Sequence, residues 1–341
     1  MPGAAESIRR IRLTPAKAPY PFRLWRNDMV SSSADQTLAV QVVDSMERMS
    51  GRHPGCRRSS ARGAVFRATF TPTGAAAALT TAAHLQTRPV TATVRFSNSE
   101  GDPHTPDTAP VTRGMATRFH LQDGSDTDLV ALSVPRFVAS TPREFLELTE
   151  ALRPDPGTRR PEPARVHAFV HAHPHLAEAV AQQPPVPASY ACTAYWAVHA
   201  FIWVDAAGAG QPVRYRWEPE AGRTDLTAAQ AATRTAHYLT DELHQRLERA
   251  PVAFDLRIQL AGPDDPTHDP STVWPDHREE ITAGRLEITA PADGQDLRDT
   301  QAFDPTRVTS GIQISDDPVL AFRAHAYAES HLRRSHERQS R

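Results

Sequence analysis

The sequence carries many short strand-like segments, and helical patterns interrupt them without alternating regularly with them. Residues 90–96 and 252–260 alternate β-branched or apolar residues with polar ones, as half-buried strands do. A ragged series of this kind is typical of an antiparallel sheet or barrel with added helices, so the sequence predicts an α+β fold. The expected strands are 63–70, 90–96, 113–121, 128–133, 195–204, 213–217, 252–260 and 284–290.

Helices are expected in five places. Residues 35–49 are amphipathic, the alanine-rich stretch 73–85 has high helix propensity, and 227–249 has a long helical pattern. Thr141 as N-cap with Glu144 three residues later predicts a capping box. Residues 163–183 form a helix that Pro174 should interrupt. A Gly-Ala-Gly turn between residues 195–204 and 213–217 predicts a hairpin.

Composition narrows the class of protein. With 341 residues, of which 39% are apolar, the chain can bury a sizeable core. A net charge of −2 gives no electrostatic reason to expect nucleic-acid partners, and no apolar run reaches the roughly 18 residues of a membrane span. Two cysteines, Cys56 and Cys192, do not make a disulfide scaffold. We therefore expect a cytoplasmic protein with neither nucleic-acid nor membrane partners.

A short stretch near the C-terminus points to a cofactor. Arg323 and Tyr327 are four residues apart, so on a helix a guanidinium lies beside the phenol oxygen and favours its ionised form. A phenolate is a hard anionic ligand for ferric iron, and tyrosine is one of the axial ligands of haem. A single Arg-x-x-x-Tyr is more often a buried aromatic residue with an exposed arginine, so the pair needs support from other segments.

That support is an ordered set of motifs. They are Val94-Arg-Phe-Ser97, Arg113-Gly114, Asp128-Leu-Val130, Val213-Arg-Tyr-Arg216, Asp265–Pro275, Phe303-Asp-Pro305, Gly311-Ile312 and Asp316–Leu320. Together with the Arg323/Tyr327 segment they resemble the catalase family over roughly residues 50 to 335. Because the chain ends just after this segment, it is similar to the short branch of the family, the catalase-related peroxidases.

The resemblance implies an antiparallel β-barrel of catalase type around one haem b. It covers a single haem-binding domain, expected over 35–335; the residues outside it are expected to form an N-terminal arm over 1–34 and a disordered tail over 336–341. Tyr327 would be the iron ligand with Arg323 assisting it, and Phe145 would lie near the haem. Arg57, Arg95 and Arg334 match the arginines that bind the haem propionates, which need charge-assisted partners when buried.

The distal side, where the family has its catalytic histidine, departs from the pattern. The family motif His-Ala-Lys-Gly aligns with Ser60-Ala-Arg-Gly63, so Ser60 occupies the histidine position. Leu132 stands where long catalases have an asparagine, and Ser99 replaces a small apolar residue of the substrate channel. A serine hydroxyl is a poor base, and the loss of one acid–base group typically costs about 10² to 10⁴ in rate.

We therefore expect a haem-dependent oxidoreductase that performs a peroxidase, oxygen-transfer or dehydration reaction on an organic small molecule, with weak or no peroxide dismutation. Hydrogen peroxide and dioxygen are both candidate oxidants. The alternative is a catalytically degenerate haem-binding or sensing protein of the same fold. Short catalase-related proteins resemble one another in forming dimers, which implies a homodimer.

A cluster of four histidines and the single residue His104 are further candidates for a metal site or a catalytic base. His167 and His171 have the i, i+4 spacing of a helical metal pair, and His173 and His175 follow them, but Pro174 disturbs the geometry. A surface cluster is the favoured interpretation. His104 lies in a predicted loop, where it is more often exposed than a substitute for the missing catalytic base.

Overall fold

The computed structural model describes residues 33–292 and 301–340, so nearly all of the expected N-terminal arm over 1–34 lies outside the described residues. Within that part of the chain, consecutive strands pair in antiparallel fashion. The strands are β1 (Gly63–Pro72), β2 (Val90–Asn98), β3 (Arg113–His120), β4 (Asp126–Leu132), β5 (Tyr195–Val204), β6 (Gly210–Pro219), β7 (Val252–Leu260), β8 (Glu280–Pro291) and β9 (Ile312–Ile314).

The first eight of these strands close into a barrel. Strand β1 pairs with both β2 and β8, and the ring is completed where Leu132 of β4 pairs with Trp196 of β5. Strand β9 adds to the edge of β5. The predicted antiparallel β-barrel with surrounding helices is confirmed, and each of the eight expected strands lies within or overlaps an observed one.

Aromatic rings fill the barrel interior. Phe70 lies edge-on to both Phe119 and Trp217, with ring centroids 5.2 and 6.1 Å away. Gly284 permits this packing, because a Cβ there would lie 2.2 Å from the Phe70 ring. Buried aromatic rings of this kind supply much of the apolar area removed from water on folding.

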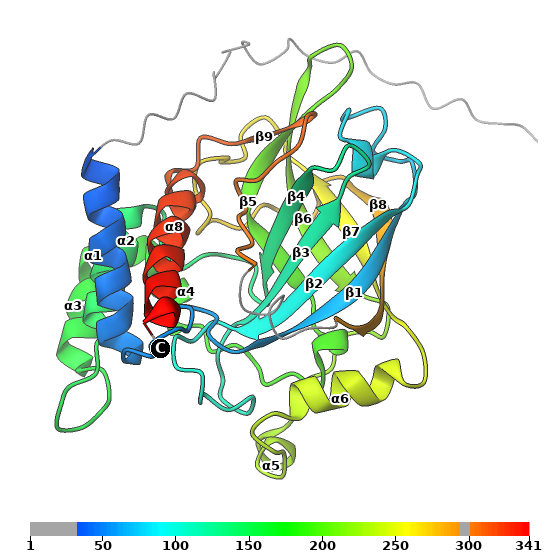
Figure 1. The fold of residues 1–341 in the computed structure, drawn as a ribbon. Coiled ribbons are helices and arrows are strands. Elements are labelled where there is room, and N and C mark those ends of the chain that lie inside the picture. The colour runs from blue at the N-terminus through cyan, green and yellow to red at the C-terminus, as the bar shows by residue number, and fades with distance from the viewer. Residues whose placement is uncertain (1–32, 293–300, 341) are drawn as a thin grey trace, which may run out of the picture.

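Helices cover one side and one end of the barrel (Figure 1). Helices α1, α2 and α8 contact one another beside the barrel, and α5 and α6 lie at one end of it. None of the helices among the described residues is both long and apolar enough to cross a membrane. The helices are α1 (Ser33–Ser50), α2 (Pro142–Ala151), α3 (Pro163–Ala172), α4 (Ala177–Ala181), α5 (Ala228–Ala231), α6 (Tyr238–Leu247) and α8 (Pro318–Gln339).

Several local predictions are confirmed. The Thr141 side chain accepts from the Glu144 N–H at 3.2 Å, while the Glu144 carboxylate accepts from the Thr141 N–H at 3.0 Å, which completes the capping box. Pro174 separates α3 from α4. The hairpin of β5 and β6 forms as expected.

The alanine-rich stretch 73–85 is not a helix. It forms a turn followed by a short 3-10 segment, Ala83–Leu85. Thr81 donates its N–H to Val204 O at 3.0 Å, and the Thr80 hydroxyl donates to Gly311 O at 2.7 Å. Tertiary hydrogen bonds and the burial of Ala76 and Ala82 therefore override the helix propensity of alanine.

The predicted helix 227–249 is divided into α5 and α6. The connecting segment bonds to the loop after β2: Asp107 donates its N–H to Ala236 O at 2.9 Å, and its carboxylate accepts from Leu239 N at 3.1 Å. Asp107 thus starts α6 from a distant part of the chain, which helical periodicity could not reveal.

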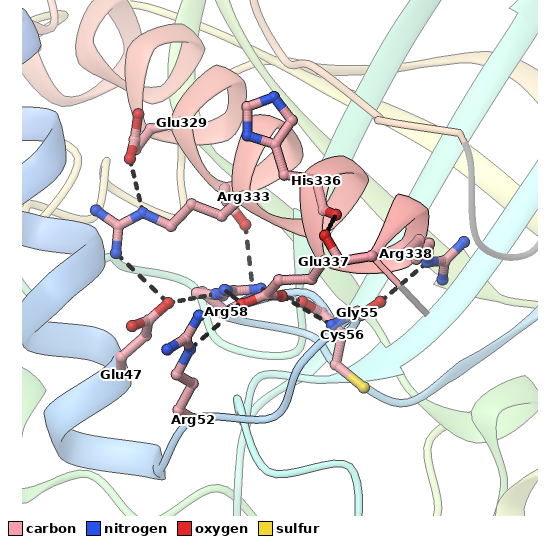
Figure 2. Close-up of polar contacts among 12 residues, drawn as sticks. Glu47, Arg52, Gly55, Cys56, Arg58, Glu329, Arg333, His336, Glu337 and Arg338 are labelled. Atoms are coloured by element: carbon pink, nitrogen blue, oxygen red, sulfur yellow. Dashed lines mark hydrogen bonds and ion pairs between the residues drawn. The ribbon is translucent and has the colours of Figure 1, made fainter.

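The C-terminal prediction also needs correction, because α8 continues to Gln339 and residues 336–339 are helical instead of disordered. Figure 2 shows the cause: Glu337 is held by Arg58, with nitrogen–oxygen distances of 2.7 and 3.0 Å, and by the Gly55 N–H at 2.8 Å. The Arg58 side chain is 3% exposed and also contacts Glu47 of α1 at 2.6 Å. This group of ion pairs joins α1, the segment before β1 and α8.

Candidate active site

A cavity of about 580 Å³ is lined by residues of the barrel and of the helices beside it. Its size falls within the range of small-molecule sites. The seven residues that the sequence predicted for the haem site all line it: Arg57, Ser60, Arg95, Phe145, Arg323, Tyr327 and Arg334. They come from the segment before β1, from β2, from α2 and from α8, so only the folded chain brings them together.

The first part of the lining is formed by α8, and we call it the tyrosine wall: Arg323, Tyr327, His331 and Arg334. Asp317 caps this helix, because one carboxylate oxygen accepts from the N–H groups of Val319 and Leu320 at 2.8 and 3.1 Å. The guanidinium of Arg323 donates through Nε to the Tyr327 hydroxyl oxygen at 3.1 Å, and Nη2 donates to the same oxygen. The predicted Arg323–Tyr327 pair is therefore present.

A buried histidine holds Arg323 in place. His199 of β5 lies at a break in the β5–β6 register, where its Nδ1 is 2.6 Å from Asp317 Oδ2 and its Nε2 is 2.9 Å from Arg323 Nη1. Burial lowers the pKa of His199 even though Asp317 lies beside it, which favours a neutral ring. A neutral ring that donates to Asp317 can accept from Arg323, so each hydrogen bond of the chain has a donor and an acceptor.

The lining carries a concentration of positive charge. Arg334 is 4% exposed and its Nη2 lies 2.9 Å from His331 Nδ1, while Arg57 donates to Gln301 O at 2.7 Å. Burial, together with the charges of Arg334, Arg57 and Arg338, lowers the pKa of His331. An anionic ligand in this part of the cavity would be stabilised.

The second part of the lining we call the serine wall: Ser59, Ser60, Arg95, Ser99, Glu100 and Leu132. Arg95, 5% exposed, donates to Ser60 O at 2.8 Å. The backbone at Ser60 has φ 56°, a left-handed conformation unusual for serine. The Ser59 hydroxyl donates to Ser99 O and the Ala61 N–H to Glu100 O, both at 2.9 Å. These bonds fix residues 59–61, which we call the serine segment, to the chain beyond β2.

Known proteins resemble this chain over most of its length. The sequence model of the catalase family matches residues 33–339. A catalase-related peroxidase of Mycolicibacterium paratuberculosis is 42% identical over 294 residues, which cover 85% of this chain and 92% of that protein. A catalase-related peroxidase of Synechococcus elongatus is 32% identical over 86% of this chain and 88% of its own length.

The chain belongs to the catalase family. It is an oxidoreductase of that family and is most similar in extent to the short, catalase-related branch. Catalase-2 of Bacillus subtilis is 28% identical, but the match covers only 38% of that longer protein. Proteins of the catalase family generally bind haem, which is consistent with the Tyr327 and arginine lining described above.

The residues present fit a haem. A planar macrocycle with two carboxylates needs a cavity with cationic side chains, and the lining holds Arg57, Arg95 and Arg334. A haem iron would need a donor atom from the protein, and Tyr327, whose oxygen accepts from Arg323, is on the same lining and would supply it. The remaining surface is largely apolar, and includes Met46, Met115, Phe145, Phe303 and Phe322.

The structure also reveals functional candidates that the sequence did not. His199 was recognised only as part of a strand, and Asp317 only as part of a family segment, because their contact joins residues 118 positions apart. Glu100 lines the serine wall, and burial raises the pKa of its carboxyl group. A glutamate directly after Ser99 is the one signal in the sequence that could have suggested an ionisable group there.

Neither His104 nor the histidine cluster of residues 167–175 lines the serine wall. Among the described residues that line the cavity, the one histidine is His331, which belongs to α8 four residues after Tyr327. His104 is exposed and does not line the cavity. His173 and His175 contact Glu144 and Glu147 of α2, in agreement with a surface cluster.

Proposed function

We propose that this member of the catalase family is a haem b peroxidase or oxygen-transfer enzyme for an organic substrate, with weak or no peroxide dismutation. The observation that carries the proposal is that the seven predicted residues line one cavity in which the tyrosine wall is complete and the serine wall lacks a histidine. The haem-binding domain would span residues 35–335, and the working form would be a homodimer.

In this proposal Tyr327 binds the iron, and the Arg323 guanidinium donates hydrogen bonds to its phenol oxygen. His199 and Asp317 position Arg323 through two hydrogen bonds, so that its charge stays directed at the phenol oxygen. Arg57, Arg95 and Arg334 hold the propionates, and Phe145 contributes apolar surface. When bound, the haem supplies an iron centre that activates peroxide for oxidation of a second substrate.

The serine wall explains why dismutation should be weak. A catalytic base must have a pKa near the working pH, and the Ser60 hydroxyl does not. Leu132 adds apolar surface to the cavity, and Ser99 provides a small hydroxyl group. A cavity with apolar walls and few polar groups favours an organic molecule over bare peroxide.

The test is to measure two rates on the same haem-loaded preparation: oxygen release from hydrogen peroxide, and peroxide-dependent oxidation of an organic electron donor such as a substituted phenol. The proposal expects the second reaction to exceed the first. Dismutation as the dominant reaction would overturn it. Haem binding without consumption of hydrogen peroxide or of an organic peroxyacid would favour the degenerate haem-binding alternative.

A further inference from the structure

Two histidines and an aspartate gather outside the cavity, in loops on either side of the serine segment. His53 follows α1, while Asp102 and His104 lie in the loop between β2 and β3. One potential ligand atom from each lies within 4.8 Å of the other two, and His53 Nε2 is 3.5 Å from Asp102 Oδ1. Among the described residues, this is the one group of three or more His, Cys, Asp or Glu side chains that approach so closely.

We propose that His53, Asp102 and His104 form a binding site for a divalent transition-metal ion, with Zn²⁺ as the best fit. Zn²⁺ readily takes two imidazole nitrogens and one carboxylate oxygen, and leaves a fourth position to water. Ligand distances of about 2.0–2.2 Å place neighbouring tetrahedral ligand atoms about 3.3–3.5 Å apart. The separation of 3.5 Å between His53 Nε2 and Asp102 Oδ1 already has this value, and no two of the three ligand atoms are more than 4.8 Å apart.

The backbone prearranges these residues. A Cβ at Gly101 would lie 2.5 Å from Arg58 O and 2.9 Å from Ser50 Cβ, so only glycine lets the two loops approach this closely. Asp102 Oδ1 accepts from the His104 N–H at 2.9 Å, and Asp102 O accepts from Thr105 N at 3.2 Å. These bonds hold Asp102 and His104 in one tight turn, and hydrogen bonds to metal ligands orient the ligands in the same way.

The cluster is open to an ion and has little else to stabilise it. The side chains of His53 and Asp102 are 27% and 40% exposed, and an ion pair so exposed contributes little by itself. His53 Nε2 also lies 3.1 Å from Ser50 O, a contact that metal binding would replace. The site contains no thiolate, so the ligand set suits Zn²⁺, Co²⁺ or Ni²⁺ better than Cu⁺.

A metal here would connect two loops that border the serine wall. His53 lies four residues before Arg57, while Ser99 and Glu100, just before Asp102, accept the hydrogen bonds of Ser59 and Ala61. Cross-linking the loops would stabilise the segment that carries Arg57 and Ser60. The site is distinct from the proposed haem site, because none of its three ligands lines the cavity.

The test is calorimetric titration of the full-length, haem-loaded, chelator-treated protein with Zn²⁺, together with thermal unfolding. We expect about one ion per chain with a Kd below about 10 µM, and a rise in Tm of a few degrees at saturation. His104→Ala and His53→Asn should each weaken binding at least tenfold. His171→Ala, an exposed histidine on α3, should not change it.

Ca²⁺ should not compete, because hard cations prefer oxygen ligands. Absence of binding at 100 µM Zn²⁺, or binding that neither His104→Ala nor His53→Asn weakens, would overturn the proposal. His104 is exposed, so its substitution should leave the fold intact, and circular dichroism of each variant checks this. Failure would leave the proposed haem chemistry unaffected, because haem content is measured on the same samples.

Discussion

The two walls of the cavity differ in the side chains that they offer to a ligand: the tyrosine wall has a hydrogen-bonded phenol, and the serine wall has a hydroxyl where the family has a histidine. The tyrosine wall has an unbroken chain of partners from the capping residue Asp317 through His199 and Arg323 to Tyr327. The serine wall is also held by hydrogen bonds, from Ser59 to Ser99 O and from Arg95 to Ser60 O. The Ser60 side chain itself offers only a hydroxyl group. In the proposed function, the groups that would hold a haem line the cavity, while no histidine is found among the described residues of the serine wall.

Of the substitutions considered, Tyr327→Phe should have the largest effect, and the quantity that it changes is the retention of haem by the tyrosine wall. It removes the hydroxyl oxygen that accepts from Arg323 Nε, and with it the proposed iron ligand. Retention of haem should fall by at least about 10²-fold, since removing a group that only hydrogen-bonds to a metal ligand already costs roughly 10- to 100-fold in affinity. The measurement is hemin titration followed by the Soret band. Tyr238→Phe, whose hydroxyl bonds to Pro187 O away from the cavity, is the matched control.

Ser60→His tests the serine wall directly. Restoring an imidazole where the family has its histidine should raise the rate of oxygen release from peroxide by at least about tenfold, because one acid–base group contributes roughly 10² to 10⁴. Ser59→His puts the same ring one residue away and should give no such gain. If Ser60→His folds, retains haem and gives no gain either, Leu132 or the cavity shape limits dismutation instead.

His199→Phe would break the chain that supports the tyrosine wall. The ring is kept, but Arg323 and the fully buried Asp317 carboxylate each lose a partner. We expect the free energy of unfolding to fall by about 2–3 kcal/mol, from leaving a buried charged group unsatisfied. The Soret band of the haem-loaded protein should shift as well. An unchanged Soret position would mean that His199 stabilises the fold without acting on Tyr327.

The ion pairs at the end of α8 give a pH prediction. Arg58, the Gly55 N–H and Arg52 lower the pKa of Glu337 to about 2, although burial opposes them. Because this pKa is depressed in the folded protein, the stability it contributes is present above the ordinary value of about 4.3 and is lost as the pH falls through about 2.

Glu337→Gln should therefore lower the free energy of unfolding by about 2 kcal/mol at pH 7 and flatten its decline in acid. Urea denaturation at pH 7 and pH 3 is the measurement. Glu220→Gln, which removes an exposed partner of Arg285, should change it by less than about 0.5 kcal/mol. Equal losses in the two variants would contradict a special role for the Arg58–Glu337 pair.

The smallest expected effect concerns the backbone at Ser60. Its positive φ is tolerated better by glycine, so Ser60→Gly should raise the free energy of unfolding, by about 0.5–1 kcal/mol. Chemical denaturation measures the change, with Ser59→Gly as the comparison. A loss of stability in Ser60→Gly would mean that the serine side chain contributes more than the strain costs.

Much of the fold and of the lining could be predicted from the sequence because those features have local signals. Strand alternation identified the barrel segments, and the Arg323/Tyr327 spacing, with the family motifs around it, identified the pair on α8. Two predictions failed where distant contacts override local preference: Thr80 and Thr81 bond across the fold in the alanine-rich stretch, and Asp107 starts α6. The C-terminal tail was predicted wrongly for the same reason, because its helix depends on Arg58.

Within the candidate site, the sequence predicted only those residues that match the motifs of the catalase family. His199 and Asp317 were missed because a hydrogen bond between β5 and the start of α8 leaves no periodic pattern in the sequence. The group formed by His53, Asp102 and His104 was likewise invisible, since its members are separated by about fifty residues and meet only through loop packing.

The most direct test of the central claim is the absorbance spectrum of the purified protein, as isolated and after titration with hemin. The account predicts a Soret band typical of high-spin ferric haem with a tyrosine ligand, saturation at one haem per chain, and a marked loss of both in Tyr327→Phe. A protein that shows no Soret absorption and takes up no added hemin would contradict it.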